Sequence, residues 1–469
     1  MSLLLRSFCA STVVFVLACV IASSPAALAG RVVNVSTTSQ LQSAITGALS
    51  GDEIVLAAGT YTPSIYLAIR TNNVLIRGVP DEPEKVIVRG AGMNVDPGTG
   101  PKEGFQIYAN DITIKDLTAS EYFNHGIHFQ TNTYRSHILN CIVRNNGQQQ
   151  IKGARYNYDG SCENVLCELT YVRTNLPSDP RGVDYVGGID LHGGVNFVLK
   201  DCIVRNIQGA GGDSDGALFA WDLCRNITME RCVVIGCNRG ICFGNNSGGS
   251  AGYDVDGGIA RNCFVYARTA GSPPADQPWL GNADCAVDLF ACRNVNFFNN
   301  TVWTDSGSYG RTIRIGKGTT YTNTNVQLSY NIFRGNIQVL TAGGYTTTGN
   351  LSGNTPQANW FFDASTANLH LTRLATAAIG QAVLLPADVP TDYDGQTRPI
   401  DGTVDVGADE FVLADTNGDG HCDVVDLLIF VAAFGANLGD PAYSAAADFN
   451  ADNAVDVVDL LILVDYFGM

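Results

Sequence analysis

Two segments near the C-terminus carry oxygen ligands at the spacing of calcium-binding loops. Such a loop has about 12 residues and supplies oxygens from positions 1, 3, 5, 9 and 12 and from the carbonyl at position 7. DTNGDGHCDVVD offers Asp415, Asn417, Asp419, His421, Asp423 and Asp426, and DFNADNAVDVVD offers Asp448, Asn450, Asp452, Ala454, Asp456 and Asp459. The sequence therefore predicts two calcium ions in this region.

Each calcium loop continues into an apolar helical stretch, DLLIFVAAFG or DLLILVDYFG. This duplicated unit, residues 412–469, resembles a type I dockerin, and the resemblance implies attachment to a cohesin. The loop positions that face the partner in that family are valines here: Val424, Val425, Val457 and Val458. Asn453 replaces the family's Gly in the second loop, but Asn tolerates a left-handed backbone, so we expect that site to survive. A calcium-stabilised module without a partner is the alternative.

Short strand-like segments in the middle of the chain place polar and aromatic residues on one face. In GIHFQ, QIKGA, GIDLH, ALFAW, GICFG, AVDLF and TIRIG, the apolar second residue should point inward, which turns the third and fifth residues outward. The second positions are Ile127, Ile151, Ile189, Leu218, Ile241, Val287 and Ile313. The outward positions are His128, Lys152, Asp190, Phe219, Cys242, Asp288 and Arg314, then Gln130, Ala154, His192, Trp221, Gly244, Phe290 and Gly316.

This predicted exposed face suits a carbohydrate. Trp221 would stack on a sugar ring, and Lys152, Asp190 and His192 would lie within two strand spacings, about 10 Å. A sheet surface holds such groups rigidly, as a binding site requires. The alternative is an ordinary solvated sheet surface that carries charges of both signs.

A lyase reaction fits part of this set. β-Elimination from a uronic acid needs a cation that neutralises the substrate carboxylate and a base that removes the α proton. Lys152 or His192 is the candidate base. Arg155, Arg314 or a calcium ion on the strand face is the candidate neutraliser.

A hydrolase would instead need two carboxylates across the scissile bond. Asp190 could pair with Asp215 or with Asp288 for this purpose. His128 would contact substrate in either case. A non-catalytic glycan-binding or surface protein, and an epimerase or other sugar-modifying enzyme, remain open as further alternatives.

These strands belong to a repeat that spans most of the chain. Phrases such as SHILNC, NFVLKDC, NITMERC and NVNFFNN recur roughly every 20 to 40 residues, which indicates a solenoid. The pattern resembles the right-handed parallel β-helix of pectate lyases, over residues 30–355, in an otherwise mainly β protein. The last residue of the phrase should form an interior column: Leu117, Cys141, Thr170, Cys202, Cys232, Cys263, Asn300 and Asn331.

The cysteines fit interior stacking better than a disulfide framework. Small buried thiols fill the same space as other interior residues, so we expect Cys141, Cys202, Cys232 and Cys263 to be free. We expect a second column of Cys162, Cys224 and Cys292. Stacked cysteines could still bridge if oxidised.

Both ends of the coil have recognisable covers. STTSQLQSAITGALSGD predicts a capping helix, with a capping box of Ser39 and Gln42 and an apolar stripe of Leu41, Ile45, Ala48 and Leu49. Residues 392–411, rich in Gly, Asp and Pro, resemble the closing segment of many secreted β-helix proteins. We expect the closing segment and linker to span residues 356–411 and to lead to the dockerin-like module.

The N-terminus predicts export. Arg6, the apolar stretch 11–21 and the small-residue site Ala27-Leu28-Ala29 indicate a signal peptide over residues 1–29, too short to span a membrane. A lipoprotein cut before Cys19 is the weaker alternative. The net charge of −17 argues against nucleic-acid binding, and an acidic substrate would need a local basic site. We expect a secreted or cell-surface-attached monomer that acts on a polysaccharide, most plausibly as a lyase.

Overall fold

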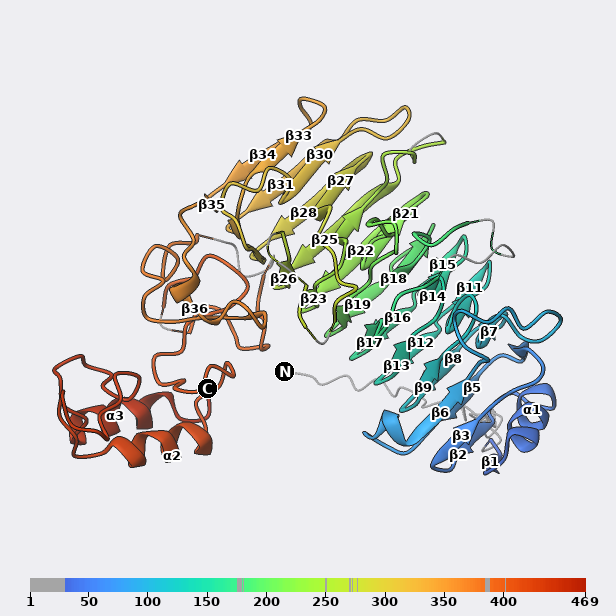
Figure 1. The fold of residues 1–469 in the computed structure, drawn as a ribbon, viewed down its shortest axis with the longest axis horizontal. Coiled ribbons are helices and arrows are strands. Elements are labelled where there is room, and N and C mark those ends of the chain that lie inside the picture. Colours follow the sequence, from blue (N-terminus) through green and yellow to red (C-terminus); the bar gives the residue numbers. More distant parts are fainter. Residues whose placement is uncertain are drawn as a thin grey trace, which may run out of the picture.

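The computed structural model describes residues 30–469 except 175–178, 180, 249–250, 270, 272, 276, 384–388 and 401. The predicted signal peptide and Cys19 lie outside the described residues. Three parallel sheets wind into an elongated coil, and two helices near the C-terminus form a separate lobe at its far end (Figure 1). Among the described residues, no helix is both long and apolar enough to cross a membrane.

The first sheet has twelve parallel strands, one from each turn of the coil. Its strands are β1 (Val32–Val35), β2 (Glu53–Leu56), β5 (Val74–Arg77), β8 (Ile112–Lys115), β12 (His137–Leu139), β16 (Ser161–Glu163), β19 (Val198–Lys200), β22 (Cys224–Glu230), β25 (Val255–Arg261), β28 (Cys292–Phe298), β31 (Thr324–Ser329) and β34 (Tyr345–Thr348). A two-stranded parallel ladder of β11 (Thr133–Tyr134) and β15 (Asn157–Tyr158) lies beside it.

The second sheet has eleven strands and follows the first in each turn. They are β3 (Gly59–Tyr61), β6 (Val86–Arg89), β9 (Thr118–Ser120), β13 (Ile142–Arg144), β17 (Leu166–Glu168), β20 (Ile203–Arg205), β23 (Val233–Ile235), β26 (Phe264–Ala267), β29 (Thr301–Thr304), β32 (Ile332–Arg334) and β35 (Leu351–Gly353). A short helix, η1 (Pro83–Lys85), precedes β6.

The third sheet has ten strands and carries the candidate site. They are β4 (Leu67–Ile69), β7 (Phe105–Ile107), β10 (Ile127–Phe129), β14 (Gln149–Gly153), β18 (Gly187–His192), β21 (Leu218–Trp221), β24 (Arg239–Phe243), β27 (Cys285–Phe290), β30 (Ile313–Gly316) and β33 (Ile337–Val339). The predicted inward residues of this sheet, from Ile127 to Ile313, are buried in one continuous core. The fold is therefore the expected parallel β-helix.

The corner between the first and second sheets repeats a left-handed residue followed by a buried one. Asn140 and Asn164 adopt positive φ there, and each precedes an interior residue. The predicted column is confirmed in seven turns but wrong at Thr170, which is exposed; Val165 occupies that position and is 1% exposed. The phrase keeps its length in that turn but ends in Val165 rather than Cys or Asn, so the alignment moved to the later CELT.

The cysteines of the described residues are all free and buried. Cys224 and Cys292 share one column, because both pair in register with Val255. Cys162 does not belong to that column, since it pairs with Leu199 instead. Burial raises the pKa of thiols such as Cys141 and Cys224 to about 12, so these side chains are apolar packing groups.

The N-terminal end of the coil is covered by helix α1 (Thr38–Thr46). Its capping box consists of Thr37 and Gln40 rather than the predicted Ser39 and Gln42. The helix begins two residues earlier than expected, because the Thr37 hydroxyl oxygen accepts a hydrogen bond of 3.2 Å from the Gln40 N–H. Leu41 and Ile45 are buried against the coil, whereas Leu49 is exposed.

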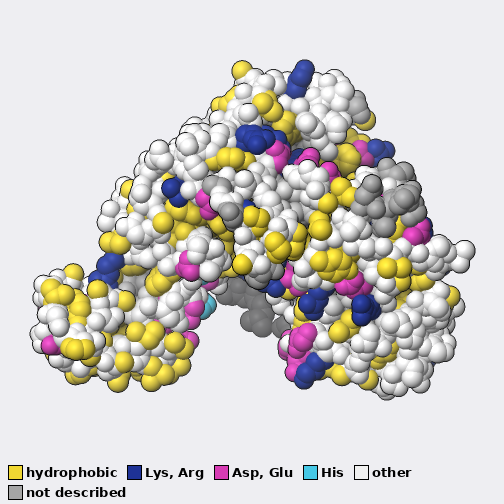
Figure 2. Space-filling view, viewed as in Figure 1, with side chains coloured by type: hydrophobic (Ala, Val, Ile, Leu, Met, Phe, Trp, Pro, Cys, Tyr) yellow, Lys and Arg dark blue, Asp and Glu magenta, His cyan; other side chains and the backbone are white. Residues whose placement is uncertain are grey.

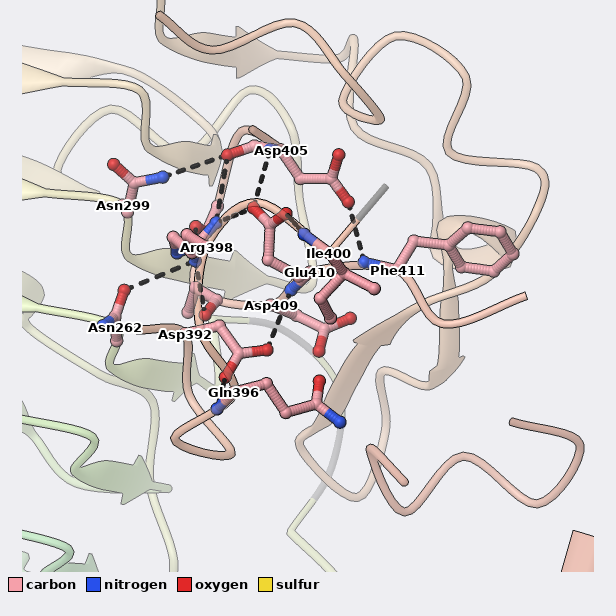
Figure 3. Close-up of polar contacts among 12 residues, drawn as sticks. Asn262, Asn299, Asp392, Gln396, Arg398, Ile400, Asp405, Asp409, Glu410 and Phe411 are labelled. Carbon is pink, nitrogen blue, oxygen red and sulfur yellow. Dashed lines mark hydrogen bonds and ion pairs between the residues drawn. The ribbon is translucent and has the colours of Figure 1, made fainter. Parts of the chain in front are cut away.

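The segment after β35 folds back against the second sheet. It contains η2 (Ala358–Trp360), the antiparallel pair β36 (Phe361–Asp363) and β37 (Asn368–Leu371), and a polar network around Arg398 (Figure 3). Arg398 is buried, pairs with Glu410 and donates to the carbonyls of Gly407 and Ala408. Asn299 of the coil donates to the Asp405 carbonyl, which ties this closing segment to the solenoid.

The C-terminal lobe holds two matching helices, α2 (Val424–Ala433) and α3 (Val457–Tyr466). Asp423 and Asp456 cap them in the same way, each accepting the N–H two residues on at 2.7 Å. A separate small core with Phe430, Phe449 and Leu463 holds the helices together.

Candidate functional site

The third positions of the ten-stranded sheet form one ladder across successive turns. The strand register pairs His128 with Lys152 and Lys152 with Asp190. The ladder continues through Phe219, Cys242, Asp288 and Arg314. Parallel pairing therefore brings together residues that lie far apart in the sequence.

The expectation that this face is exposed is wrong over most of its length. Lys152 is 7% exposed and Asp190 is 1% exposed. The loop before β18 covers the ladder with Tyr185, whose hydroxyl lies 3.5 Å from Lys152 Nζ. The loop before β21 adds Asp215, which accepts a hydrogen bond of 2.6 Å from Gln149. Half-buried side chains, including His192 and Trp221, form the accessible edge of this ladder.

Lys152 is the centre of the buried cluster. Its Nζ lies 2.5 Å from Asp190 Oδ2 and 2.6 Å from His192 Nε2. Burial acts to lower the Lys152 pKa, but the Asp190 carboxylate outweighs burial and raises it. Burial likewise acts to raise the Asp190 pKa, but the attraction of the Lys152 ammonium outweighs burial and lowers it well below its ordinary value. Both groups are therefore charged in the resting site, and Lys152 has no free lone pair to act as a base.

His192 has a defined tautomer in this arrangement. An ammonium group only donates hydrogen bonds, so the Nε2 atom that faces Lys152 must carry the lone pair. The proton then resides on Nδ1, which lies 3.7 Å from Asp222 Oδ2. Arg155 holds that carboxylate through two hydrogen bonds of 2.6 and 2.7 Å. Arg155 thus positions Asp222 from the surface rather than entering the buried cluster.

Trp221 links the acidic and aromatic parts of the site. Its indole Nε1 donates to Asp190 Oδ1 at 2.9 Å. Its ring stacks on Phe219 at 5.4 Å between centroids and meets the His192 ring edge-on at 4.3 Å. The indole is thereby fixed in orientation, which favours a defined contact with a ligand.

Asp215 differs from Asp190 in pKa although the two lie close enough to interact. Burial and the neighbouring Asp190 charge raise the pKa of Asp215 to about 6. Asp190 stays ionised because Lys152 neutralises it. Two carboxyl groups with separated pKa values are a common sign of distinct acid and base roles.

Asp288 and Arg314 form a second, separate cluster. The Arg314 guanidinium donates two hydrogen bonds to the Asp288 carboxylate, at 2.6 and 2.7 Å. Arg239 donates to the same carboxylate at 2.7 Å. These arginines line a cavity of about 360 Å³ together with Asp213 and Phe290. Arg314 lies five strand spacings from Lys152, about 24 Å, so it cannot act on the same bond. The pairing of Asp190 with Asp288 as one hydrolytic site fails for the same reason.

Sequence reasoning missed several side chains that build the site. Tyr185 and Gln149 contact the cluster, and Arg239 completes the cavity beside Arg314. They lie in loops or at strand ends, where no repeat marked them. Glu103 also escaped notice, although its carboxylate lies 3.0 Å from His128 Nδ1. The pair of histidines in NHGIHF was the available signal.

The first predicted calcium loop has the geometry that a cation needs. Asp415, Asp419 and Asp426 each bring one carboxylate oxygen within 4.8 Å of the others. Asp415 is held by the N–H groups of Gly418 and Gly420, at 2.7 and 3.0 Å. Burial and the neighbouring Asp426 and Asp419 charges raise the pKa of Asp415. Converging, mutually repelling carboxylates fit a bound calcium ion.

The second loop holds its carboxylates through matching backbone contacts. Asp448 accepts from Asp452 and Asn453, and Asp459 accepts from the N–H of Phe449 at 2.7 Å. Asn453 has φ 74°, so it adopts the left-handed backbone that its position requires.

Comparison with known proteins separates the two parts of the chain. Residues 413–468 match the family model described as "Dockerin type I domain". No curated protein sequence matches the chain. Pectate lyase Pel9A is similar in structure, with 13% identity and a TM-score of 0.51 over 79% of this chain and 90% of that chain.

Two further solved structures are similar at lower scores. An alginate lyase from Paenibacillus sp. str. FPU-7 has 15% identity and a TM-score of 0.43, over 69% of this chain and 98% of that chain. An endo-xylogalacturonan hydrolase from Aspergillus tubingensis has 11% identity and a TM-score of 0.44, over 68% and 92%. The chain therefore consists of a parallel β-helix with the fold of pectate lyase Pel9A and, at residues 413–468, a type I dockerin domain.

Proposed function

We propose that this protein is a secreted polysaccharide lyase that is attached to a partner through its dockerin. The observation that carries the proposal is the Lys152–Asp190–His192 cluster, with Trp221 fixed at its accessible edge. It combines a cation, a potential base and an aromatic surface within one part of a rigid sheet. These are the groups that elimination from a uronic acid requires.

The assignment of roles follows from the resting protonation. The substrate carboxylate draws the Lys152 ammonium toward itself, which neutralises the carboxylate and frees His192 Nε2. That nitrogen takes the α proton, the electron pair forms the new C=C bond, the glycosidic C–O bond breaks and the leaving oxygen takes a proton from solvent. Asp222 faces Nδ1 and keeps His192 in the required tautomer.

The first test is a panel of polysaccharides with purified residues 30–469 in calcium. A lyase produces both new reducing ends and the ultraviolet absorbance of an unsaturated uronate. Reducing ends without absorbance would replace the lyase with a hydrolase. Glycan binding that depends on Trp221, with no products, would make the protein a non-catalytic binder.

A hydrolase is the second candidate because of one observation. Asp215, with its pKa raised to about 6, is suited to donate a proton to a leaving group, while Asp190 remains ionised. Asp215→Asn distinguishes the two reactions. It removes the acid of a hydrolase, whereas the lyase described above leaves Asp215 without a chemical role.

We also propose that the dockerin helices dock a cohesin through an apolar face (Figure 2). Val424 and Val457 are 56% and 57% exposed, although a large apolar side chain is usually buried. The face is present twice, because each helix carries the same four exposed positions: Val424, Val425, Leu428 and Val431 on α2, and Val457, Val458, Leu461 and Val464 on α3. Either helix can therefore offer the same contact.

A further inference from the structure

Two histidines and a glutamate meet beside the Lys152 cluster without any role in the proposed reaction. Glu103 precedes β7, and one turn further along the coil His125 lies just before β10 and His128 lies within it. Each of the three offers an atom within 4.8 Å of the other two. Imidazole nitrogen and carboxylate oxygen are the ligand types that zinc and related transition ions bind.

His125 points an unpartnered nitrogen at this meeting point. The residue is 3% exposed, and its Nδ1 lies 3.2 Å from the Gln149 carbonyl. A carbonyl only accepts, so Nδ1 carries the proton and Nε2 carries the lone pair. Nε2 lies 3.9 Å from Glu103 Oε1 and makes no hydrogen bond among the described residues. A lone pair and a carboxylate oxygen that face each other at this distance repel, and a cation between them would remove the repulsion.

The surroundings match those of metal-ligating residues in proteins. A ligating histidine donates its other N–H to a carbonyl, and a ligating carboxylate is itself hydrogen-bonded. His125 has the first feature. Glu103 has the second, since Gln106 Nε2 donates to its Oε2 at 2.7 Å.

The distances need only small adjustment. With metal bonds of about 2.0–2.2 Å, adjacent ligand atoms of a tetrahedral site are roughly 3.3 Å apart. His125 Nε2 lies 3.9 Å from Glu103 Oε1. His128 Nδ1 lies 3.0 Å from Glu103 Oε2 and hydrogen-bonds to it, so a bound ion would take the place of the proton in that contact. Glu103 and His128 are half-buried, so a fourth ligand position faces solvent.

We propose that Glu103, His125 and His128 bind a divalent transition ion of the zinc class, beside the strand that carries Lys152. This site is distinct from the two calcium loops in both ligand type and location. It does not depend on the reaction proposed above, so it can be tested without a substrate.

Cobalt is the probe, because its ligand-field absorption reports coordination directly. Residues 30–469 are stripped with chelator, returned to excess calcium so that the dockerin loops are filled, and titrated with Co²⁺. We expect one equivalent to bind with a tetrahedral or five-coordinate spectrum and no thiolate-to-cobalt charge transfer. Zn²⁺ should displace it, and further Ca²⁺ should not.

The ligands are tested with Glu103→Gln and His128→Asn, both at half-buried positions. Each should weaken cobalt binding by more than about 100-fold, and Gln106→Leu by about 10- to 100-fold. His137→Asn is the matched control, since His137 lies on the twelve-stranded sheet against Ser161 Oγ and should bind normally. Circular dichroism confirms that each variant is folded.

Three results would overturn the proposal. They are the absence of a bound equivalent, a thiolate charge-transfer band, and binding that survives both Glu103→Gln and His128→Asn in folded protein. The last two would place the ion elsewhere.

Discussion

At the scale of single residues, the site depends on how buried charges are paired. Lys152 is the cation that keeps Asp190 ionised in an apolar environment. Removing one partner of a buried pair leaves an uncompensated charge and costs about 3–5 kcal/mol. Lys152→Ala should therefore lose stability as well as activity. A loss of activity in this variant alone does not assign a catalytic role to Lys152.

We therefore predict that Lys152→Ala is destabilised, whereas Lys152→Met combined with Asp190→Asn recovers most of the loss. Thermal unfolding of the three proteins measures this. Arg135→Ala is the comparison, because its pair with Asp111 is exposed and should contribute little. An unchanged melting temperature for Lys152→Ala would show that Asp190 is solvated and not dependent on Lys152.

His192→Gln tests the base without breaking an ion pair. The amide can still accept from Lys152 but cannot take a proton, so we expect turnover to fall by about 10²–10⁴-fold. Substrate binding, measured separately, should change little. Arg155→Ala should have a smaller effect on the same rate, since it acts through Asp222. Equal losses in the two variants would contradict the division of roles.

At the scale of elements, the closing segment is sensitive to pH. Burial raises the pKa of Asp392 to about 6, and burial with the nearby Glu410 raises that of Asp405 to about 7. A carboxyl group with a raised folded-state pKa binds more protons when folded than unfolded. Its stabilisation is complete below about pH 4 and is lost as pH rises through about 6 to 7.

Asp392→Asn should therefore reduce the pH dependence of stability between pH 4 and 7. For Asp392 the change across this window is of the order of 3 kcal/mol. Denaturant unfolding of wild type and variant at several pH values measures the difference. The stability of the wild type relative to the variant should fall as pH rises from 4 to 7; a constant difference would mean that folding does not shift the pKa of Asp392.

The dockerin helices make a different prediction, because their exposed faces are duplicated. Val424→Asp should leave cohesin binding largely intact, and so should Val457→Asp, since the other helix still offers an apolar face. The double variant should lose binding. Surface binding to an immobilised cohesin that recognises the wild type measures all three. Loss of binding in one single variant alone would assign docking to that helix.

At the scale of the whole molecule, the first calcium loop is joined to the closing segment. Asn368 donates to the Gly418 carbonyl and Gln396 donates to the Gly420 carbonyl, at 2.8 and 2.7 Å. Arg373 reaches the Asp448 carbonyl of the second loop at 2.8 Å. Calcium binding should therefore stabilise more than the dockerin alone.

Removal of calcium, or Asp415→Ala, should increase amide hydrogen exchange in residues 389–411 as well as in residues 412–469. Exchange in the strands from β2 to β21 should not change, since no hydrogen bond or ion pair among the described residues joins them to the lobe. Hydrogen exchange with mass spectrometry measures all these regions together. Exchange confined to the dockerin would show that the two parts are independent.

The sequence alone determined the architecture and the calcium loops, because both depend on local, repeated patterns. The inward Ile127, Ile151 and Ile189 follow from strand alternation, and Asp415 to Asp426 follow from loop spacing. The capping box was displaced by two residues, and Thr170 was placed in a column that belongs to Val165. In both cases the predicted element is present, and only the position of a residue along the sequence was wrong.

Only the tertiary structure decided the site. Sequence alternation placed Lys152, Asp190 and His192 on the same face, but it could not tell that loops bury them or that Arg314 lies about 24 Å away. Nor could it predict that Glu103 lies beside His125, or that Arg155 pairs with Asp222. The physical reason is that protonation, burial and distance depend on contacts between turns and loops, and no local sequence pattern specifies those contacts.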